Sequence, residues 1–167
     1  RLKALPPNYT PQEIKNIYGD GNIPPLSQYV YDFASQFEGK GENTFETALI
    51  VLRYFQVNFD YDYDTWFGTS SSSGPSQDQD WVEWFLQRRK GISIHFATAY
   101  IITLRILGIS ARLVFGFLPG EESQGSRIVK NKHLHFWAEV WIPIKTDSGV
   151  DGVWVAFDPS PPGYLEA

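Results

Sequence analysis

Three segments of the sequence carry side chains that could perform nucleophilic chemistry on a carbonyl group. Ser93 stands at the start of a long apolar segment, His135 lies within an alternating segment, and Asp158 ends a third. A hydroxyl or thiol nucleophile, an imidazole base and a carboxylate that orients the base are the groups that acyl transfer requires. We therefore take these three residues as candidate catalytic groups and ask which elements would position them.

Ser93 follows Gly91, and the apolar residues after it recur at helical spacing as far as Leu107, before Gly108. This pattern predicts a helix over residues 92–107 that is buried on most sides. A nucleophile in its first turn would lie among unpaired N–H groups, which lower the pKa of a thiol and can hold an oxyanion. Serine is also a preferred helix cap, so Ser93 could serve only to begin the helix.

His135 lies in a segment that alternates from residue 133 to residue 141, which predicts a strand. The even positions are apolar and should face the core, whereas His135, Trp137 and Glu139 should share the opposite face. A histidine that large aromatic rings shield only in part suits a general base. An ordinary histidine on the outer surface of a sheet is the alternative interpretation.

Asp158 ends a predicted strand over residues 153–158. This strand could form a hairpin with the strand over residues 134–142. If Asp158 then lies opposite His135, the turn is centred between residues 146 and 147. The residues there have the composition of a turn. Cross-strand neighbours on one face lie about 5 Å apart, so Asp158 opposite His135, or within two residues of it, could orient the imidazole. A slip of one residue would turn the carboxylate to the other face.

The elements around these segments follow from the same patterns. Capped helices are predicted upstream of residue 58, and a short helix over residues 79–88 precedes the buried one. A strand over residues 111–117 follows the buried helix, and two polar segments, 68–80 and 119–131, should be loops. Helices first and strands afterwards, with no alternation of the two, predict an α+β fold with an antiparallel sheet.

Together these segments resemble the core of the transglutaminase-like family of the papain-like superfamily. The family pattern is Gly-x-Cys at the head of a helix, then Leu-Arg-x-x-Gly-Ile-Pro-Ala-Arg, His-Ala-Trp-x-Glu-Val in a strand, and Trp-x-x-x-Asp-Pro-Thr. The matching stretches here are Gly91-x-Ser93, Leu104 to Arg112, His135 to Val140, and Trp154 to Ser160. The flank, with Leu5-Pro6-Pro7 and Ala48 to Tyr61, resembles the extracytoplasmic transglutaminase-like domains of bacterial and archaeal membrane proteins.

The resemblance covers nearly the whole chain and implies a papain-like fold with the nucleophile-bearing helix packed on the sheet. It places the Cys-His-Asp triad of the family on Ser93, His135 and Asp158. It implies an N-terminal helical flank over residues 1–40 and a catalytic core over residues 41–167, within one domain. It also implies a protein or peptide substrate, a membrane-anchored parent protein and an extracytoplasmic location.

The sequence departs from the family pattern at the nucleophile, where Ser93 replaces cysteine. A serine hydroxyl is far less acidic than a thiol, so the resting ion pair with His135 would be lost and little turnover is expected. The serine was either introduced to trap an inactive form or is a natural variant. Two functions stay open: acyl transfer at a glutamine or peptide carbonyl, by protease, amidase or transglutaminase chemistry, and a non-catalytic module that binds peptide or cell-envelope ligands.

Composition narrows the possible partners. The chain has 167 residues, of which 16% are aromatic and 20% charged, as in a globular domain. A net charge of -5, with no basic run beyond residues 88–90, argues against nucleic acid. The absence of cysteine, and three histidines without further ligand spacing, predict no metal and no cofactor. No apolar stretch is long enough to cross a bilayer, and the absence of methionine indicates a domain excised from a longer protein.

Smaller candidates surround the proposed nucleophile. Trp66, Trp81 and Gln87 could each donate to an oxyanion, although core packing is the more ordinary role of the two tryptophans. Three aspartates alternate like calcium ligands, but the glycine and distal glutamate of a calcium loop are missing, so a solvated strand face is expected. The serine-rich loop over residues 68–79 is expected to be a mobile flap that borders the cleft. The three aspartates are Asp60, Asp62 and Asp64.

Overall fold

A computed structural model describes residues 10–63, 74–147 and 149–162 of the chain. Helices form most of the first part of the described chain, and the longest strands form its last part. The elements, in chain order, are α1 (Pro11–Tyr18), η1 (Asp20–Asn22), α2 (Gln28–Ser35), α3 (Thr44–Asn58), β1 (Asp60–Tyr61), α4 (Trp81–Arg88), β2 (Lys90–Gly91), α5 (Ser93–Ile106), β3 (Ala111–Phe117), β4 (Glu121–Ser123), β5 (Ser126–Ile128), η3 (Asn131–His133), β6 (Leu134–Thr146) and β7 (Gly149–Phe157).

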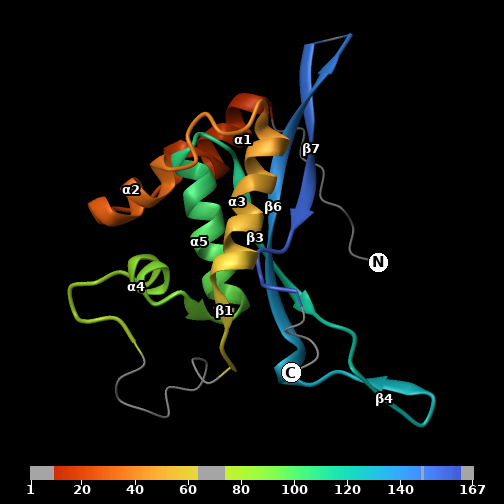
Figure 1. Cartoon of the computed structure of the whole chain (residues 1–167). Coiled ribbons are helices and arrows are strands. Elements are labelled where there is room, and N and C mark those ends of the chain that lie inside the picture. The colour runs from red at the N-terminus through yellow and green to blue at the C-terminus, as the bar shows by residue number, and fades with distance from the viewer. Residues whose placement is uncertain (1–9, 64–73, 148, 163–167) are drawn as a thin grey trace.

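The three longest strands form one antiparallel sheet in the order β3-β6-β7. Helix α5 packs against β6 and β3, and helices α2, α3 and α4 pack around α5 (Figure 1). Two small pairs complete the described strands: β1 with β2, which run parallel, and β4 with β5. The α+β prediction is confirmed, and so is the packing of the predicted helix on an antiparallel sheet.

Helix α5 is buried almost all round, as its apolar sequence predicts. Phe96, Ala97, Tyr100 and Leu104 have no exposed surface, and they belong to a core that also holds aromatic residues of α3 and α4. Full burial of a large apolar side chain contributes roughly 1.5–3 kcal/mol before conformational entropy is counted. The first residue of α5 therefore has a rigid support, which a nucleophile position requires.

Side-chain caps fix where the other helices begin. Thr10 and Glu13 form a capping box at α1, and Asn43 accepts a hydrogen bond from Glu46 N–H at the start of α3. Asp80 does the same for α4. Capped helices were predicted upstream of residue 58, and each of these side chains satisfies a backbone N–H that would otherwise lack a partner in the helix.

The β6–β7 hairpin is longer than predicted, and its register differs by two residues. Thr146 pairs with Gly149 and Ala138 pairs with Phe157, so the turn is centred one residue later than expected. The position that follows Phe157 is therefore opposite Trp137 rather than His135. A shift of two residues keeps every side chain on its face, whereas a shift of one would not. The carboxylate of Asp158 thus stays on the same face as His135, within the range that the sequence allows.

Residues 119–131 are not the plain polar loop that their composition predicts. They hold the β4–β5 hairpin, which projects from the end of the sheet where β6 begins (Figure 1). Gln124 and Gly125 both have positive φ, at 48° and 78°. This is the conformation of a two-residue hairpin turn whose twist matches that of its strands. A glutamine in the first of these positions is uncommon, which is why the turn was missed.

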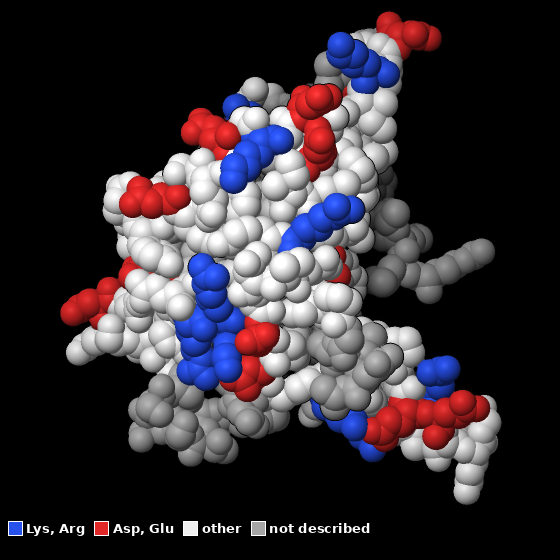
Figure 2. All heavy atoms as spheres, in the orientation of Figure 1, with Lys and Arg blue, Asp and Glu red and all other residues white. Residues whose placement is uncertain are grey.

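Charged side chains on the face seen in Figure 2 lie singly or in small mixed groups, separated by wide uncharged areas. One such group lies on the projecting hairpin, where Glu121 contacts both Lys130 and Lys132. The hydrogen bond from Lys130, followed by the one from Lys132, lowers the pKa of Glu121 to about 2. No helix among the described residues has the length and apolar character needed to cross a membrane.

Candidate active site

The site forms where β7 stops and leaves one edge of β6 without a strand. β7 ends at Phe157, opposite Ala138, so the first residues of β6 have no partner on that side within the β6–β7 ladder. The first residue of α5 lies at this vacated edge: the backbone N–H of Phe136 donates to the Ser93 hydroxyl at 3.3 Å. The sheet therefore fixes Ser93 through the residue that follows His135.

Ser93 does not serve as the cap of α5. The N-cap residue is Ile92, and Ser93 is the first helical residue, with 2% of its surface exposed. Its backbone N–H donates to the Tyr61 hydroxyl at 3.2 Å. Ser93 is therefore a buried hydroxyl at the positive end of a helix, held by a strand and by an aromatic hydroxyl.

His135 and Asp158 are in direct contact. The Nε2 atom of His135 lies 2.7 Å from an Asp158 carboxylate oxygen, and the other carboxylate oxygen accepts a hydrogen bond from Ser160 N–H at 3.0 Å. The side chain of Gln56 donates to the Asp158 backbone carbonyl at 2.9 Å, which ties this segment to α3. The carboxylate is thus oriented from both sides and in turn fixes one ring nitrogen of the histidine.

The prediction that His135 is only partly shielded is wrong. Its exposed fraction is 3%, whereas Leu134 and Phe136, its apolar neighbours, are half-buried. The ring of Trp137 stacks on the imidazole at 6.4 Å between centroids. Gly116, which pairs with His135 across the sheet, leaves room for that indole, because a Cβ there would lie 2.9 Å from it.

Burial alone would raise the pKa of the Asp158 carboxyl. Its hydrogen bonds with His135 and with Ser160 N–H outweigh burial, so its pKa lies below the ordinary value of aspartic acid. The Asp158 carboxyl therefore stays ionised at neutral pH. The ionised carboxylate can only accept, so the Nε2–H group of His135 donates the hydrogen bond between them.

Tyr61 is a site residue that the sequence did not reveal. Besides accepting the Ser93 N–H bond, its ring stacks in parallel on Phe96 of α5 at 6.0 Å. Burial raises the pKa of the Tyr61 hydroxyl, while its hydrogen bonds with Ser93 act in the opposite direction. The phenol remains protonated at neutral pH and can donate a hydrogen bond. The sequence pointed to this region only through the stretch from Ala48 to Tyr61, which resembles the family flank. That resemblance assigns no role to Tyr61 itself.

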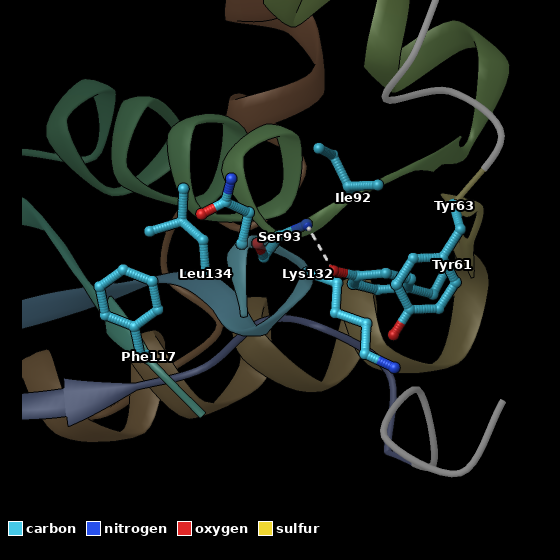
Figure 3. Close-up of a pocket in the computed structure, with 8 residues that line it drawn as sticks. Tyr61, Tyr63, Ile92, Ser93, Phe117, Lys132 and Leu134 are labelled. Atoms are coloured by element: carbon cyan, nitrogen blue, oxygen red, sulfur yellow. Dashed lines mark hydrogen bonds between the residues drawn. The ribbon is translucent and has the colours of Figure 1, made fainter. Parts of the chain in front are cut away.

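A cavity of about 390 Å³ opens next to Ser93. Figure 3 shows Tyr61 and Tyr63 on one side of Ser93, and Phe117 and Leu134 on the other. The Lys132 side chain extends toward the tyrosines. The walls are mainly apolar and aromatic. A cavity of this kind can enclose an extended side chain and hold its terminal carbonyl against the helix N-terminus.

The candidate oxyanion donors have different positions. Gln87 is exposed and bonds Gln79 and Glu83. Trp81 is 55% exposed and stacks on His95, so the predicted role in core packing is also wrong for this residue. Trp66 and residues 68–73 of the predicted flap lie outside the described residues. Neither Trp81 nor Gln87 has a hydrogen bond to Ser93.

Two residues of the predicted aspartate row lie within the described part of the chain. Asp60 is exposed, and Asp62 lies 3.3 Å from Arg88. Asp64 lies outside the described residues. Among the residues that the structure does describe, no three histidine, cysteine, aspartate or glutamate side chains are grouped as metal ligands.

His95 fixes the loop before the nucleophile. Its Nδ1 atom accepts a hydrogen bond from Ile92 N–H at 3.2 Å, and aromatic rings of α4 surround the imidazole. Gly91 is required here, because a Cβ at this position would lie 2.7 Å from that nitrogen. Burial, and secondarily the charge of Arg88, lowers the pKa of His95 to about 4. His95 can accept this hydrogen bond only while its imidazole is neutral.

We expect the His95 imidazole to make stability depend on pH. Between about pH 6.5, the ordinary histidine pKa, and about pH 4, the unfolded chain binds a proton that folded His95 does not. The free energy of unfolding should therefore fall as the pH decreases through this window, by up to about 1.4 kcal/mol per pH unit. His95→Asn keeps an acceptor for Ile92 N–H but does not titrate, so urea unfolding should show a shallower decline.

The matched control is His133→Asn. The Nδ1 atom of His133 accepts an equivalent bond from Lys130 N–H at 2.8 Å, in an exposed setting. If both substitutions flatten the pH dependence equally, the His95 imidazole is not its source.

A buried helix packed on an antiparallel sheet, with a hydrogen-bonded His-Asp pair near the N-terminus of that helix, is the arrangement of a papain-like fold. A family model for the transglutaminase-like superfamily matches residues 31–159. The chain belongs to this superfamily.

Two curated relatives match parts of the sequence. YebA of Bacillus subtilis is 29% identical over 143 residues, which cover 81% of this chain and 18% of YebA. A protein-glutamine gamma-glutamyltransferase of Pseudomonas aeruginosa is 34% identical over 89 residues, which cover 52% of this chain and 12% of that protein. The chain therefore spans less than a fifth of the length of either relative.

A solved structure has the same fold. The periplasmic domain of TgpA from Pseudomonas aeruginosa superposes with a TM-score of 0.68 at 23% identity. The match covers 91% of this chain and 48% of that domain. The likeness establishes the fold and leaves the roles of individual residues to the geometry of this site.

Proposed function

We propose that this chain is the acyl-transfer domain of a larger extracytoplasmic, membrane-anchored protein, and that it acts on a glutamine or peptide carbonyl. The observation that carries the proposal is the 2.7 Å contact between His135 and Asp158, next to the helix N-terminus that holds Ser93. The periplasmic location of the TgpA domain supports the location, and the curated gamma-glutamyltransferase supports the chemistry.

Each site residue has a role in this proposal. Ser93 occupies the nucleophile position, and the acyl group approaches through the adjoining cavity. With His135 Nε2 engaged by Asp158, proton exchange with the nucleophile falls to Nδ1. Attack on the carbonyl carbon turns its oxygen into an oxyanion. The Ser93 N–H and the Tyr61 hydroxyl, now bonded to each other, would both donate to that oxygen.

Serine at the nucleophile position limits the rate. A thiol at this helix terminus would ionise near neutral pH, whereas a hydroxyl must lose its proton during attack. The site would then release ammonia or an amine from the acyl group and pass the acyl group to water or to a second amine. We therefore expect very slow turnover by the chain with Ser93.

Ser93→Cys tests the proposal directly. The substrate is a glutamine peptide with hydroxylamine as acceptor, and the products measured are the hydroxamate and released ammonia. We expect the substitution to raise both rates by at least about 10³-fold, because the thiolate forms without concerted proton removal. Asp158→Ala in the same background should remove most of the gain. Equal, negligible rates with and without the cysteine would contradict the acyl-transfer function.

Ser93 itself favours a second candidate, a module that binds peptide or envelope ligands without chemistry. A site that lost its thiol could retain the cavity and its aromatic walls. In that case the Ser93→Cys variant would bind peptide yet form no hydroxamate. The 2.7 Å His135–Asp158 contact favours catalysis, because a binding module has no need of an oriented base.

A further inference from the structure

Strand β3 forms one edge of the main sheet. It pairs with β6 on one side, and no strand among the described residues pairs with its other side. Trp141 N–H donates to the Ser110 carbonyl at 2.9 Å. At the other end, Leu118 N–H donates to the His133 carbonyl at 2.8 Å. In an antiparallel pair, residues whose backbone groups bond the partner strand alternate with residues whose backbone groups point away from it. The even-numbered residues of β3 therefore bond to β6, and the backbone groups of the odd-numbered residues face outward.

The outward backbone groups of β3 differ in their partners. The Ala111 carbonyl accepts two hydrogen bonds from the Arg105 guanidinium, at 3.1 and 2.9 Å. The N–H and C=O groups of Leu113, Phe115 and Phe117 make no hydrogen bond within the described part of the chain. Three donors and three acceptors are therefore left in a row, at the spacing that an added strand would match.

The side chains of these three residues are apolar and open to solvent. Leu113 is 44% exposed, Phe115 67% and Phe117 60%. Soluble proteins usually protect such an edge with a charge or a proline. The charged residue of this strand, Arg112, is on the opposite face, where it bonds Glu139. An unprotected apolar edge favours aggregation, so its presence indicates a function.

The edge leads into the cavity at Ser93. Phe117 lines that cavity opposite the two tyrosines (Figure 3), and Phe115 lies 6.0 Å from the ring of Phe136, whose N–H bonds the Ser93 hydroxyl. A strand rises about 3.3 Å per residue, so Leu113 lies roughly 13 Å from the cavity wall. Four residues of extended chain would cover this distance.

We propose that the outer edge of β3 binds the extended stretch of a polypeptide substrate next to the residue whose acyl group enters the cavity. This proposal depends on the proposed function at one point: it assumes that the group that reaches Ser93 is a carbonyl of a polypeptide. Backbone hydrogen bonds to the three outward residues give affinity for any extended sequence. Contacts with Leu113, Phe115 and Phe117 select apolar side chains at alternate positions. The substrate class is an unfolded or flexible segment rather than a helical one.

Binding to the chain with Ser93 tests this without chemistry. The probe is a fluorescent eleven-residue peptide with glutamine at its centre and valine at alternate positions on both sides, and its Kd is measured by anisotropy. Phe115→Pro removes one outward N–H and one aromatic side chain but no bond to β6, as prolines at sheet edges allow. We expect Kd to rise at least about tenfold. Phe115→Lys, which keeps the backbone donor, serves as the second variant in case the proline disturbs folding.

Two controls isolate the backbone pairing. Val153→Lys changes another exposed apolar residue, 46% exposed, on β7, and should leave Kd within about twofold. The nitrogens of the peptide form two alternating sets, and only one set of N–H groups faces β3. N-methylation of that set should weaken binding strongly, and N-methylation of the other set should weaken it little.

Three outcomes would overturn the proposal. The first is a Kd that ignores both Phe115 variants, and the second is equal sensitivity to the two methylation sets. The third is a concentration-dependent dimer that Phe115→Pro disperses in sedimentation, which would assign the edge to a second copy. Failure of Ser93→Cys to form hydroxamate, with peptide binding retained, would refute the proposed function and leave the docking edge standing.

Discussion

Ser93→Cys should carry a reactive thiolate at a pH where an ordinary thiol is protonated. At pH 6 we expect iodoacetamide to alkylate it at least about tenfold faster than an exposed thiol. The thiol would lie in the first turn of α5, 2% exposed in the parent residue. The parent hydroxyl bonds the residue that follows His135, whose imidazole an ionised carboxylate holds. Both features stabilise a negative charge. The measurement is the alkylation rate from pH 4 to pH 9, which gives the thiol pKa.

The test includes two comparisons. Ser76→Cys places a thiol at an exposed position and supplies the ordinary rate. Adding His135→Ala to Ser93→Cys should raise the thiol pKa and bring the rate at pH 6 close to this ordinary value, because the imidazolium is lost. If the thiol at position 93 titrates like the one at position 76 and is indifferent to His135, the three residues do not act together, and the binding module becomes the better interpretation.

The main elements could be read from the sequence because each has a strong local signal. The apolar run after Ser93 demanded a buried helix, and the alternation around His135 demanded a strand with Ala138 and Val140 toward the core, where both are fully buried. Periodicity also kept Asp158 on the face of His135 even though the register differed by two residues. The division into a flank over residues 1–40 and a catalytic core stays a prediction.

The rest depended on contacts that no local pattern encodes. The burial of His135 follows from the place where β7 ends, which is set by three-dimensional packing rather than by alternation within β6. Tyr61 reaches Ser93 only because β1 pairs in parallel with β2, across some thirty residues of chain. Short parallel pairs of this kind have no composition that separates them from loops. A substitution at Tyr61 therefore tests a role that only the three-dimensional structure indicates.

Tyr61→Phe, in the Ser93→Cys background, should lower the rate of hydroxamate formation by on the order of 10²-fold or more, the usual effect of losing one oxyanion donor. The phenylalanine keeps the ring that stacks on Phe96 and removes only the hydroxyl. Alkylation by iodoacetamide forms no oxyanion, so its rate should change no more than about twofold. This contrast separates a catalytic hydroxyl from one that merely supports the helix.

Tyr63→Phe is the matched control, since Tyr63 lines the same cavity and lies 4.9 Å from the Tyr61 ring. It should leave both rates nearly unchanged.

The Tyr61 hydroxyl could act in the opposite sense, because it accepts the hydrogen bond from the Ser93 N–H, which an oxyanion would need. A Tyr61→Phe variant that forms hydroxamate faster than its parent would show that the hydroxyl competes with the oxyanion. A slower variant with normal alkylation would establish it as a donor, because loss of the hydroxyl then affects only the step that develops negative charge on oxygen.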